Sequence, residues 1–325
     1  MSDGSRHLSR GSVIGRVVRP RVLIYTAVLV LIWGSTWTAI RYQLGVEAPG
    51  WSIAWRFVFA SLAMGLYARL AGVSLRLAPR DLPLLLGIAM TQFVLNFLFV
   101  YNAERFITSG LVAMIFALLI VPNAVLGRIF LKQRVGGAFF VGSLLAGLGM
   151  ALLFRHEIAQ AAGGGSTVLL GIGLSLFGIL SASVGNLLQA SQRASHLHAA
   201  QLLFWAMALG AIANMVIALP MSGLPRIDPR PEYWLATLWL AFVGSALTFP
   251  LYLHVMRAIG PARAAYSSVL IPIVAMLFST LLEGYRWAGM AVAGALLAGL
   301  GLVIALRGKS GAQAPSASKA ASPAR

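Results

Sequence analysis

Cysteine is absent from this sequence, so a disulfide framework, a thiolate nucleophile and a cysteine-based metal site are all excluded. Charged side chains are scarce as well, at 10% of the 325 residues, against about 25% in an average soluble domain. Only eight residues are Asp or Glu, which leaves few carboxylates to titrate. What remains is a chain with 59% hydrophobic residues and a mean hydropathy of +0.85, whose expected solvent is the lipid bilayer.

Ten apolar runs approach the length of a membrane-spanning helix, which needs about 20 residues to cross the hydrocarbon. None shows the ten-residue alternation of a membrane barrel strand, so the backbone groups are expected to pair within helices. The sequence predicts an all-α integral membrane fold with ten transmembrane helices. The runs cover residues 22–40, 52–71, 82–101, 108–131, 137–154, 168–190, 200–220, 233–256, 261–282 and 287–306.

The second half of the chain resembles the first. The hexapeptide LLAGLG occurs at 144–149 and again at 296–301, and Pro122 and Pro272 lie 150 residues apart in similar apolar runs. A repeat of about half the chain in a membrane protein suggests a transporter built from two halves. Each half holds five spans, an odd number, so the second copy must enter the membrane from the opposite side. We therefore expect two inverted five-helix repeats.

The basic residues indicate how the chain is oriented. If the N-terminus is cytoplasmic, eighteen of the 25 Lys and Arg residues fall inside, six fall outside, and Arg56 lies just within the second span. The positive-inside rule then places both termini in the cytoplasm. The net charge of +17 does not indicate a nucleic-acid partner, because the basic residues lie between spans and form no single face. The expected divisions are a cytoplasmic basic tail at 1–21, a first repeat at 22–155, a Gly-rich external linker at 156–167, a second repeat at 168–307 and a disordered cytoplasmic tail at 308–325.

Polar side chains inside apolar spans point to a pathway, because hydrocarbon makes them costly unless they face protein or water. Five spans carry such residues at helical spacing or in adjacent positions, which gives each of them a polar stripe. These groups either hold helices together, at about 0.6 kcal/mol per hydrogen bond, or line a central cavity, which five stripes in one chain favour. The predicted substrate-binding residues are Trp33, Thr36, Trp37, Gln92, Asn96, Asn186, Gln189, Thr248, Tyr252, Ser267 and Ser268.

Small residues and prolines have structural interpretations. Small residues at four-residue spacing let helices approach closely, so they predict a tight contact within the monomer, or a homodimer through the small-residue faces of the fifth and tenth helices. Pro122 and Pro272 are expected to kink their helices and are candidate hinges. The small residues are Gly142, Ala146, Gly147, Ala151, Gly294, Ala295, Ala298 and Gly299.

Proton coupling or gating would need a group that titrates beside the pathway, and Glu104, His254 and Glu283 near the ends of spans are the candidates. Glu283 also has a plainer interpretation, as a helix-end carboxylate near Arg286. No carboxylate occupies a mid-span position, so a facilitator and a proton-coupled exporter both remain open. A cavity for a nucleotide diphosphate would need Lys or Arg in mid-span, and none is expected there.

Five segments carry a resemblance to a known family: WGSTWTAIR at 33–41, WRF at 55–57, FLKQRVGG at 130–137, SVGNLLQASQR at 183–193, and GPARAAYSSVLIPIVAML from 260 leading into LLEGYRWAG. Over about residues 22–307 the chain resembles the EamA family of the drug/metabolite transporter superfamily. The resemblance implies ten helices in two inverted repeats, both termini inside, and export of metabolites, amino acids among them, or of toxic compounds. Its usual setting is the bacterial inner membrane. An acidic residue commonly ends the fourth-span motif, where this chain has Gln133; Glu283 keeps it in the second copy.

Together these features predict an exporter of small organic metabolites, such as amino acids, amines or drug-like compounds, that works by alternating access without a cofactor or metal. A nucleotide-sugar or other metabolite carrier is the alternative within transport. A membrane-embedded lipid-modifying enzyme is disfavoured, because the sequence has no Gly-x-Ser-x-Gly, no His-Glu-x-x-His and no intramembrane cluster of Asp, Glu and His. A sensor or scaffold without flux fits the duplicated halves less well. The expected partners are a small-molecule substrate and membrane lipids.

Overall fold

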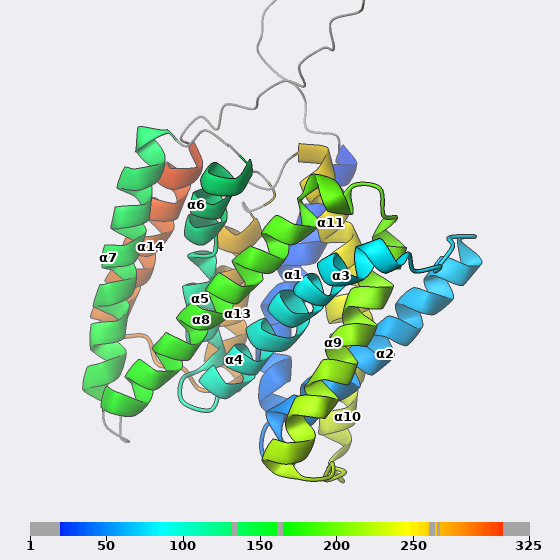
Figure 1. The fold of residues 1–325 in the computed structure, drawn as a ribbon. Coiled ribbons are helices and arrows are strands. Elements are labelled where there is room, and N and C mark those ends of the chain that lie inside the picture. Colours follow the sequence, from blue (N-terminus) through cyan, green and yellow to red (C-terminus); the bar gives the residue numbers. More distant parts are fainter. Residues whose placement is uncertain (1–19, 132–135, 161–164, 260–263, 265–266, 308–325) are drawn as a thin grey trace, which may run out of the picture.

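The computed structural model describes residues 20–131, 136–160, 165–259, 264 and 267–307, and within these ranges every regular element is helical (Figure 1). The expected tails at 1–21 and 308–325 lie outside the described residues, apart from the first two residues of α1, and so does Gln133. The elements of the first half are α1 (Pro20–Gln43), α2 (Pro49–Leu70), η1 (Pro79–Asp81), α3 (Leu82–Ile88), η2 (Ala89–Leu95), α4 (Asn96–Ala103), α5 (Ser109–Ala117), α6 (Ile120–Leu131) and α7 (Gly137–Gln160). Those of the second half are α8 (Gly165–Gln189), η3 (Gln192–Ala194), α9 (Ala199–Ser222), α10 (Pro231–Leu238), η4 (Trp239–Leu247), α11 (Thr248–Ile259), α13 (Ser267–Leu282) and α14 (Gly289–Arg307).

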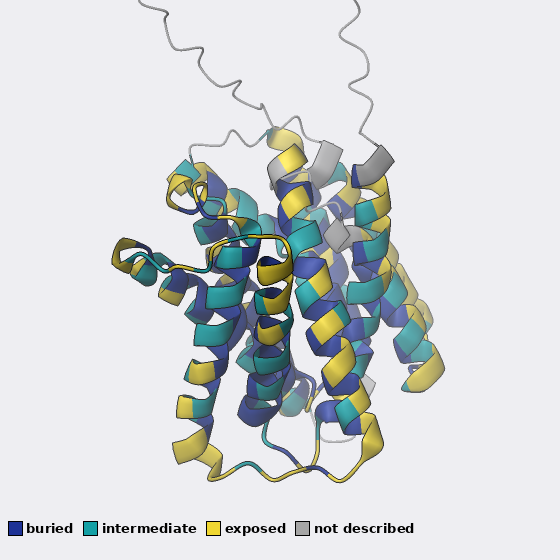
Figure 2. Cartoon of the chain, turned by 90° about the vertical axis from the view of Figure 1, so that its right-hand side faces the viewer, coloured by how far each residue is buried: buried dark blue, intermediate teal, exposed yellow. Residues whose placement is uncertain are grey.

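Among the described residues, seven helical stretches are long and apolar enough to cross a membrane: Val22–Gln43, Pro49–Leu70, Pro79–Ala103, Ser109–Leu131, Gly165–Gln189, Ala199–Ser222 and Pro231–Met256. Three shorter apolar helices accompany them: Gly137–Leu153, Leu270–Leu282 and Gly289–Ile304. The expected all-α membrane fold is therefore found, whereas the count of ten crossings stays a prediction. Buried residues face one another within the bundle, and exposed ones follow its outer faces (Figure 2).

Apolar side chains also cover the outside of the bundle, as they must when the surrounding solvent is lipid. Leu62 and Leu66 on α2, and Leu144 on α7, each expose more than half of their surface. Exposed leucines in such number on the surface of a soluble protein would mark an interaction site. Proline opens α1, α2, η1 and α10, because a residue without an N–H group leaves no donor unpaired in the first turn of a helix.

Two π-helical segments occupy matching places in the two halves. η2 begins at Ala89 and η4 begins at Trp239, which are 150 residues apart, the same offset that relates Pro122 to Pro272. Their packing partners match as well, because η2 contacts α8 and α9 while η4 contacts α1 and α2. The segments α4 and α11 likewise contact α8 and α1, respectively. π-Helical turns are rare in proteins, and those that occur are often found at functional sites.

The two prolines of the repeat act differently on their helices. A break at Leu118 and Leu119 separates α5 from α6, and there Leu118 N–H donates to the carbonyl of Ile115 at 2.9 Å, a tighter turn than the α-helical one. Pro122 explains the break, because its ring crowds the carbonyl four residues earlier and it has no N–H to donate. Pro272, in contrast, lies inside the continuous helix α13. That either proline is a hinge stays a prediction.

Helices α7 and α14 pack along their length through small residues and form one side of the bundle (Figure 1). A Cβ atom added at Gly149 would lie 2.6 Å from the carbonyl oxygen of Gly294, and one added at Gly301 would lie 2.6 Å from that of Gly142. The tight contact expected within the monomer is thus present. Gly147 and Gly299 point elsewhere, since a Cβ there would meet no described atom within 4 Å. A homodimer through that remaining face stays a prediction.

The region of the expected external linker is partly helical. Helix α7 continues to Gln160 and α8 begins at Gly165. Residues 161–164 lie outside the described ranges. That residues 156–167 form an external linker between the two repeats stays a prediction.

Candidate functional site: a cavity between the two halves

A cavity of about 130 Å³ lies among helices of both halves. Because one water molecule needs roughly 10–15 Å³ by this measure, the cavity has room for on the order of ten waters, or for one small organic molecule. Its lining residues are Trp33, Thr36, Trp37, Ile40, Arg56, Gln92, Asn96, Phe97, Val100, Ala113, Phe116, Leu119, Ala182, Asn186, Phe249, Tyr252 and Ile271.

Seven of the eleven residues that the polar stripes singled out line this cavity. They come from α1, η2, α4, α8 and α11, so stripes that are distant in sequence meet in space. The seven are Trp33, Thr36, Trp37, Gln92, Asn96, Asn186 and Tyr252. That they contact a substrate stays a prediction.

The other four predicted residues have different positions. Gln189 donates a hydrogen bond of 3.2 Å to the carbonyl of Gly185 on its own helix. Thr248 accepts a 2.9 Å hydrogen bond from the indole Nε1 of Trp33 and itself donates to the carbonyl of Gly244 at 2.7 Å. Thr248 therefore orients a cavity residue without lining the cavity. The backbones of Ser267 and Ser268 form the start of α13, and their side chains lie outside the described part of the chain.

Aromatic rings form much of the cavity wall. The ring centroid of Trp33 lies 5.1 Å from that of Tyr252 and 5.7 Å from that of Phe249, and the centroid of Trp37 lies 4.9 Å from that of Phe116. Centroid separations of 4.5–7 Å are those at which aromatic pairs attract. The wall is thus rigid and suited to contact the apolar part of an organic molecule.

Arg56, which belongs to none of the predicted polar stripes, also lines the cavity. The residue is 2% exposed; its Nε donates to the hydroxyl of Ser245 at 3.1 Å, and its guanidinium carbon lies 4.4 Å from the ring centroid of Phe97. The expectation that no cation reaches the middle of the pathway is therefore wrong. Arg56 lies just within the second predicted span, and its side chain extends inward to Phe97 of α4 and Ser245 of η4.

Four cavity residues carry polar atoms that have no hydrogen-bond partner among the described residues. They are two donors, Trp37 Nε1 and Arg56 Nη1, and two acceptors, Gln92 Oε1 and Asn96 Oδ1. Buried polar groups are normally paired, and each one left unpaired costs about 1–3 kcal/mol. Unmet donors and acceptors around one cavity are what a polar ligand or bound water would satisfy.

Glu283 forms a polar cluster with residues of the first half. Its Oε2 accepts a hydrogen bond from the backbone N–H of Ser109 at 3.2 Å, its Oε1 accepts one from the Ser109 hydroxyl, and Arg41 Nε lies 4.0 Å from Oε2. The carboxylate thus links α13 to α5 and α1. Its cationic partner is Arg41, whereas the sequence suggested Arg286.

Glu104 is fully buried just beyond the membrane-spanning segment Pro79–Ala103. Neither of its carboxylate oxygens has a hydrogen-bond partner among the described residues, although Arg41 donates to its backbone carbonyl. Burial raises the pKa of the Glu104 carboxyl well above its usual range, and the charge of Glu283 raises it further, against lowering by Arg41 and Arg56.

His254 does not line the cavity. Its side chain is exposed, and its ring packs edge-on against Tyr25 with 5.5 Å between centroids. Within the described ranges no group of three or more His, Cys, Asp or Glu side chains lies close enough to hold a metal ion. Coupling through His254 stays a prediction that the geometry of the cavity does not favour.

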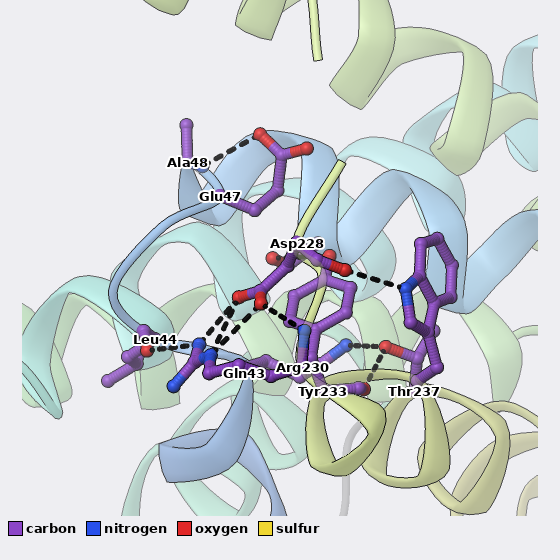
Figure 3. A network of polar contacts seen from close by, with 10 residues as sticks. Gln43, Leu44, Glu47, Ala48, Asp228, Arg230, Tyr233 and Thr237 are labelled. Carbon is purple, nitrogen blue, oxygen red and sulfur yellow. Dashed lines mark hydrogen bonds and ion pairs between the residues drawn. The ribbon is translucent and has the colours of Figure 1, made fainter. Parts of the chain in front are cut away.

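A network at the end of the bundle where α1 finishes joins two connecting segments (Figure 3). Arg230 binds the buried Asp228 through Nη2 at 2.6 Å and donates from the same nitrogen to the carbonyl of Leu44 at 3.1 Å. Hydrogen bonding from Arg230 lowers the pKa of Asp228. Nearby, Glu47 accepts from the backbone N–H of Ala48 at 2.9 Å, and burial raises the pKa of Glu47.

The same network continues between helices of the two halves (Figure 3). Gln43 donates to the hydroxyl of Thr237 at 2.6 Å and accepts from the phenol of Tyr101 at 2.6 Å, while the hydroxyls of Ser52 and Tyr233 lie 3.0 Å apart. All five side chains are buried. The halves are thus held together by polar contacts at this end of the bundle.

A family model described as the EamA-like transporter family matches the chain twice, at residues 20–155 and 169–307. The chain belongs to this family. The two matches correspond to the two halves that flank the cavity, and the relatives of this EamA-like transporter are named in similar terms. Together with its long apolar helices, this makes the chain an integral membrane transporter.

Three curated relatives are similar over most of their length. The uncharacterised transporter YdfC of Bacillus subtilis (strain 168) is 22% identical over 81% of this chain and 84% of its own. A probable amino-acid metabolite efflux pump of Escherichia coli (strain K12) is 24% identical over 86% and 93%, and the uncharacterised inner membrane transporter YedA of the same strain is 26% identical over 79% and 81%. A solved crystal structure matches with a TM-score of 0.66 at 16% identity, over 89% of this chain and 97% of the other, a likeness of fold.

Proposed function

We propose that this transporter exports small organic metabolites, such as amino acids, amines or drug-like compounds, by alternating access between two inverted five-helix repeats. The observation that carries the proposal is the cavity of about 130 Å³ whose wall combines Trp33, Thr36 and Trp37 of the first half with Asn186 and Tyr252 of the second. A site shared by two halves is the arrangement that alternating access requires, because rocking one half against the other changes the side from which the site is reached.

The matched geometry of the halves supports the inverted repeat. The π-helical segments η2 and η4 begin 150 residues apart, and each packs against the corresponding helices of the opposite half. The start of α1 and the end of α14 lie at the same end of the bundle (Figure 1). That placement, with the excess of basic residues on one side, supports cytoplasmic termini and a bacterial inner-membrane setting.

The relatives supply the direction of transport for this proposal. One of them is named as an amino-acid metabolite efflux pump and another as an inner membrane transporter. A nucleotide-sugar carrier is the second candidate, because Arg56 lines the cavity. It is the weaker one, since Arg56 is the single cationic side chain among the described residues that line the cavity, and a diphosphate carries more than one negative charge. The lining residues include no carboxylate or histidine for lipid chemistry, so an enzyme is not proposed.

The test is efflux from proteoliposomes loaded with labelled amino acids and organic cations, with and without an imposed pH gradient. We expect protein-dependent efflux that falls at least about ten-fold when Trp33 and Trp37 are both changed to Ala, since stacking and the indole donors are lost together. The control is the double change Trp239→Ala and Trp287→Ala, two tryptophans that are each 42% exposed and outside the cavity. Full transport by the Trp33/Trp37 variant would defeat the assignment of the aromatic wall, and absence of flux for every compound would contradict export of these classes.

A further inference from the structure

We propose that Arg56 binds a carboxylate of the substrate, so that small organic carboxylates with an apolar body are the preferred cargo. The inference rests on the proposed function, because it names the substrate class of the same cavity. It follows from three features of the cavity wall. Arg56 is buried and has a donor without a hydrogen-bond partner, no carboxylate forms an ion pair with it, and two side-chain acceptors on the same wall also lack partners among the described residues.

The guanidinium of Arg56 is held in place without being satisfied. Its Nε donates to Ser245 Oγ at 3.1 Å, and its carbon lies 4.4 Å and 5.4 Å from the ring centroids of Phe97 and Phe57. Nη1 has no hydrogen-bond partner among the described residues. The rings of Phe57 and Phe97, the Ser245 hydroxyl and the nearby Tyr101 phenol thus fix the plane of the group, while Nη1 is left available. A planar donor fork matches a carboxylate in geometry as well as in charge.

No carboxylate forms an ion pair with Arg56 within the described part of the chain. The ion pairs found there involve Arg41, Arg80, His196 and Arg230, and none involves Arg56. Glu104 is the carboxyl whose charge reaches Arg56, and its own two oxygens are unpaired. Because an unpaired buried charge is costly, an anionic ligand would relieve a cost that the protein alone does not remove.

The remaining polar atoms indicate what else the ligand carries. Within the described part of the chain, two acceptors lack a hydrogen-bond partner, Gln92 Oε1 and Asn96 Oδ1 at the junction of η2 and α4, and so does one donor, Trp37 Nε1. An ammonium or hydroxyl group next to the carboxylate would satisfy the two acceptors. The apolar body of the ligand would then contact the rings of Trp33 and Phe116, which line the same cavity.

A purely structural role for Arg56 is the competing explanation, since its bond to Ser245 joins α2 to η4. Binding measurements with matched ligands separate the two roles, because a structural arginine affects all ligands alike. L-Leucine and L-leucinamide have nearly the same shape and differ in whether the terminal group is an anion. 4-Methylpentanoate keeps the carboxylate and lacks the amine, and 3-methylbutylamine keeps the amine and lacks the carboxylate.

The experiment is calorimetric titration of these four compounds into the purified full-length protein in detergent. Because hydrogen bonds to charged groups contribute about 1.5–3 kcal/mol, we expect L-leucine to bind roughly ten- to one-hundred-fold more tightly than L-leucinamide. 4-Methylpentanoate should bind better than 3-methylbutylamine. Arg56→Gln should abolish the preference for the carboxylate, and Arg56→Lys should retain part of it. The matched control is Arg69→Gln, an exposed arginine in the last turn of the same helix, which should retain all of it.

Equal affinity of the wild-type protein for L-leucine and L-leucinamide would overturn the proposal, and so would an unchanged preference in a folded Arg56→Gln variant. If that variant does not fold, the ligand comparison on the wild-type protein and Arg56→Lys still decides. Efflux of labelled amines from proteoliposomes with no binding of either carboxylate would overturn the carboxylate site and leave the export function standing. Binding with the carboxylate preference but no flux of any compound would contradict the export function and leave the carboxylate site standing.

Discussion

The α7–α14 contact and the cavity wall are both built from apolar helices, but the first is formed by small residues and the second by aromatic and polar ones. Between α7 and α14, small residues bring two backbones so close that a single added methyl at Gly149 or Gly294 would clash with backbone atoms. Around the cavity, large aromatic side chains contact one another across helices, and four polar atoms have no hydrogen-bond partner among the described residues. The α7–α14 contact is thus closed by backbone packing, whereas the cavity wall leaves the hydrogen bonding of its polar side chains incomplete.

The largest expected effect comes from breaking the packed region. Gly149→Ala would place a methyl 2.6 Å from the carbonyl oxygen of Gly294, and overpacking of this kind costs about 1–3 kcal/mol. Gly147→Ala is the matched control on the same helix, where a Cβ meets no described atom within 4 Å. Its expected effect is neutral, or stabilising by up to about 1 kcal/mol, because Ala favours a helix more than Gly does. Thermal unfolding in detergent measures both, and equal shifts for the two variants would contradict the close contact.

A smaller effect is expected when the orientation of the cavity wall is disturbed. Thr248→Val removes the hydroxyl that accepts from Trp33 Nε1 at 2.9 Å, a bond worth about 1 kcal/mol, so substrate flux should fall by roughly five-fold. Thr280→Val is the control, since its hydroxyl accepts from the indole of Trp287 at 3.0 Å outside the cavity. Efflux rates from proteoliposomes report both, and equal losses of flux would show that indole–hydroxyl pairs matter only for general stability.

The smallest effect concerns the polar network beyond the cavity. The folded-state pKa of Asp228 is lowered by Arg230, so its contribution to stability is present above the unfolded pKa of about 3.9 and is lost as pH falls through the folded value. Asp228→Asn should therefore flatten the fall in unfolding temperature on acidification below about pH 4. An unaltered acid profile in Asp228→Asn would rule out the assigned role of the Asp228–Arg230 pair.

Glu47 in the same network has a raised pKa, so its effect on stability has the opposite sign. Stability falls as pH rises from the unfolded pKa of about 4.3 through the folded value. Glu47→Gln should remove that decline in the unfolding temperature.

Much of the fold follows from hydropathy alone, because every apolar run of helix length in the described part of the chain is helical. The polar stripes also led to seven cavity residues, since a polar group in hydrocarbon has few places to go. Arg56 was missed for a physical reason. Its backbone lies in the second turn of α2, but a long side chain can extend away from its own backbone, and only the contacts with Phe97 and Ser245 reveal that it extends to the cavity.

A related limit explains why some predicted residues do not line the cavity. Spacing of three or four places side chains on one face only if the helix is a regular α-helix. Thr248 follows directly after the nine-residue π-helical segment η4, so its facing cannot be derived from a 3.6-residue period. Gln189 shows a second limit, because an amide can bond to its own helix, as it does to Gly185, and then needs no cavity.

The π-helical segments also have a consequence for how these helices tolerate changes in length. Deleting one residue from an ordinary α-helix rotates everything beyond it by about 100°, which turns a lipid-facing side chain toward the protein. Within Ala89–Leu95 the turns already hold more residues than an α-helix needs, so a single deletion there can be absorbed by tightening to α-helical turns. The segment beside the cavity is therefore the place in its span where the chain can lose a residue and keep the orientation of the rest.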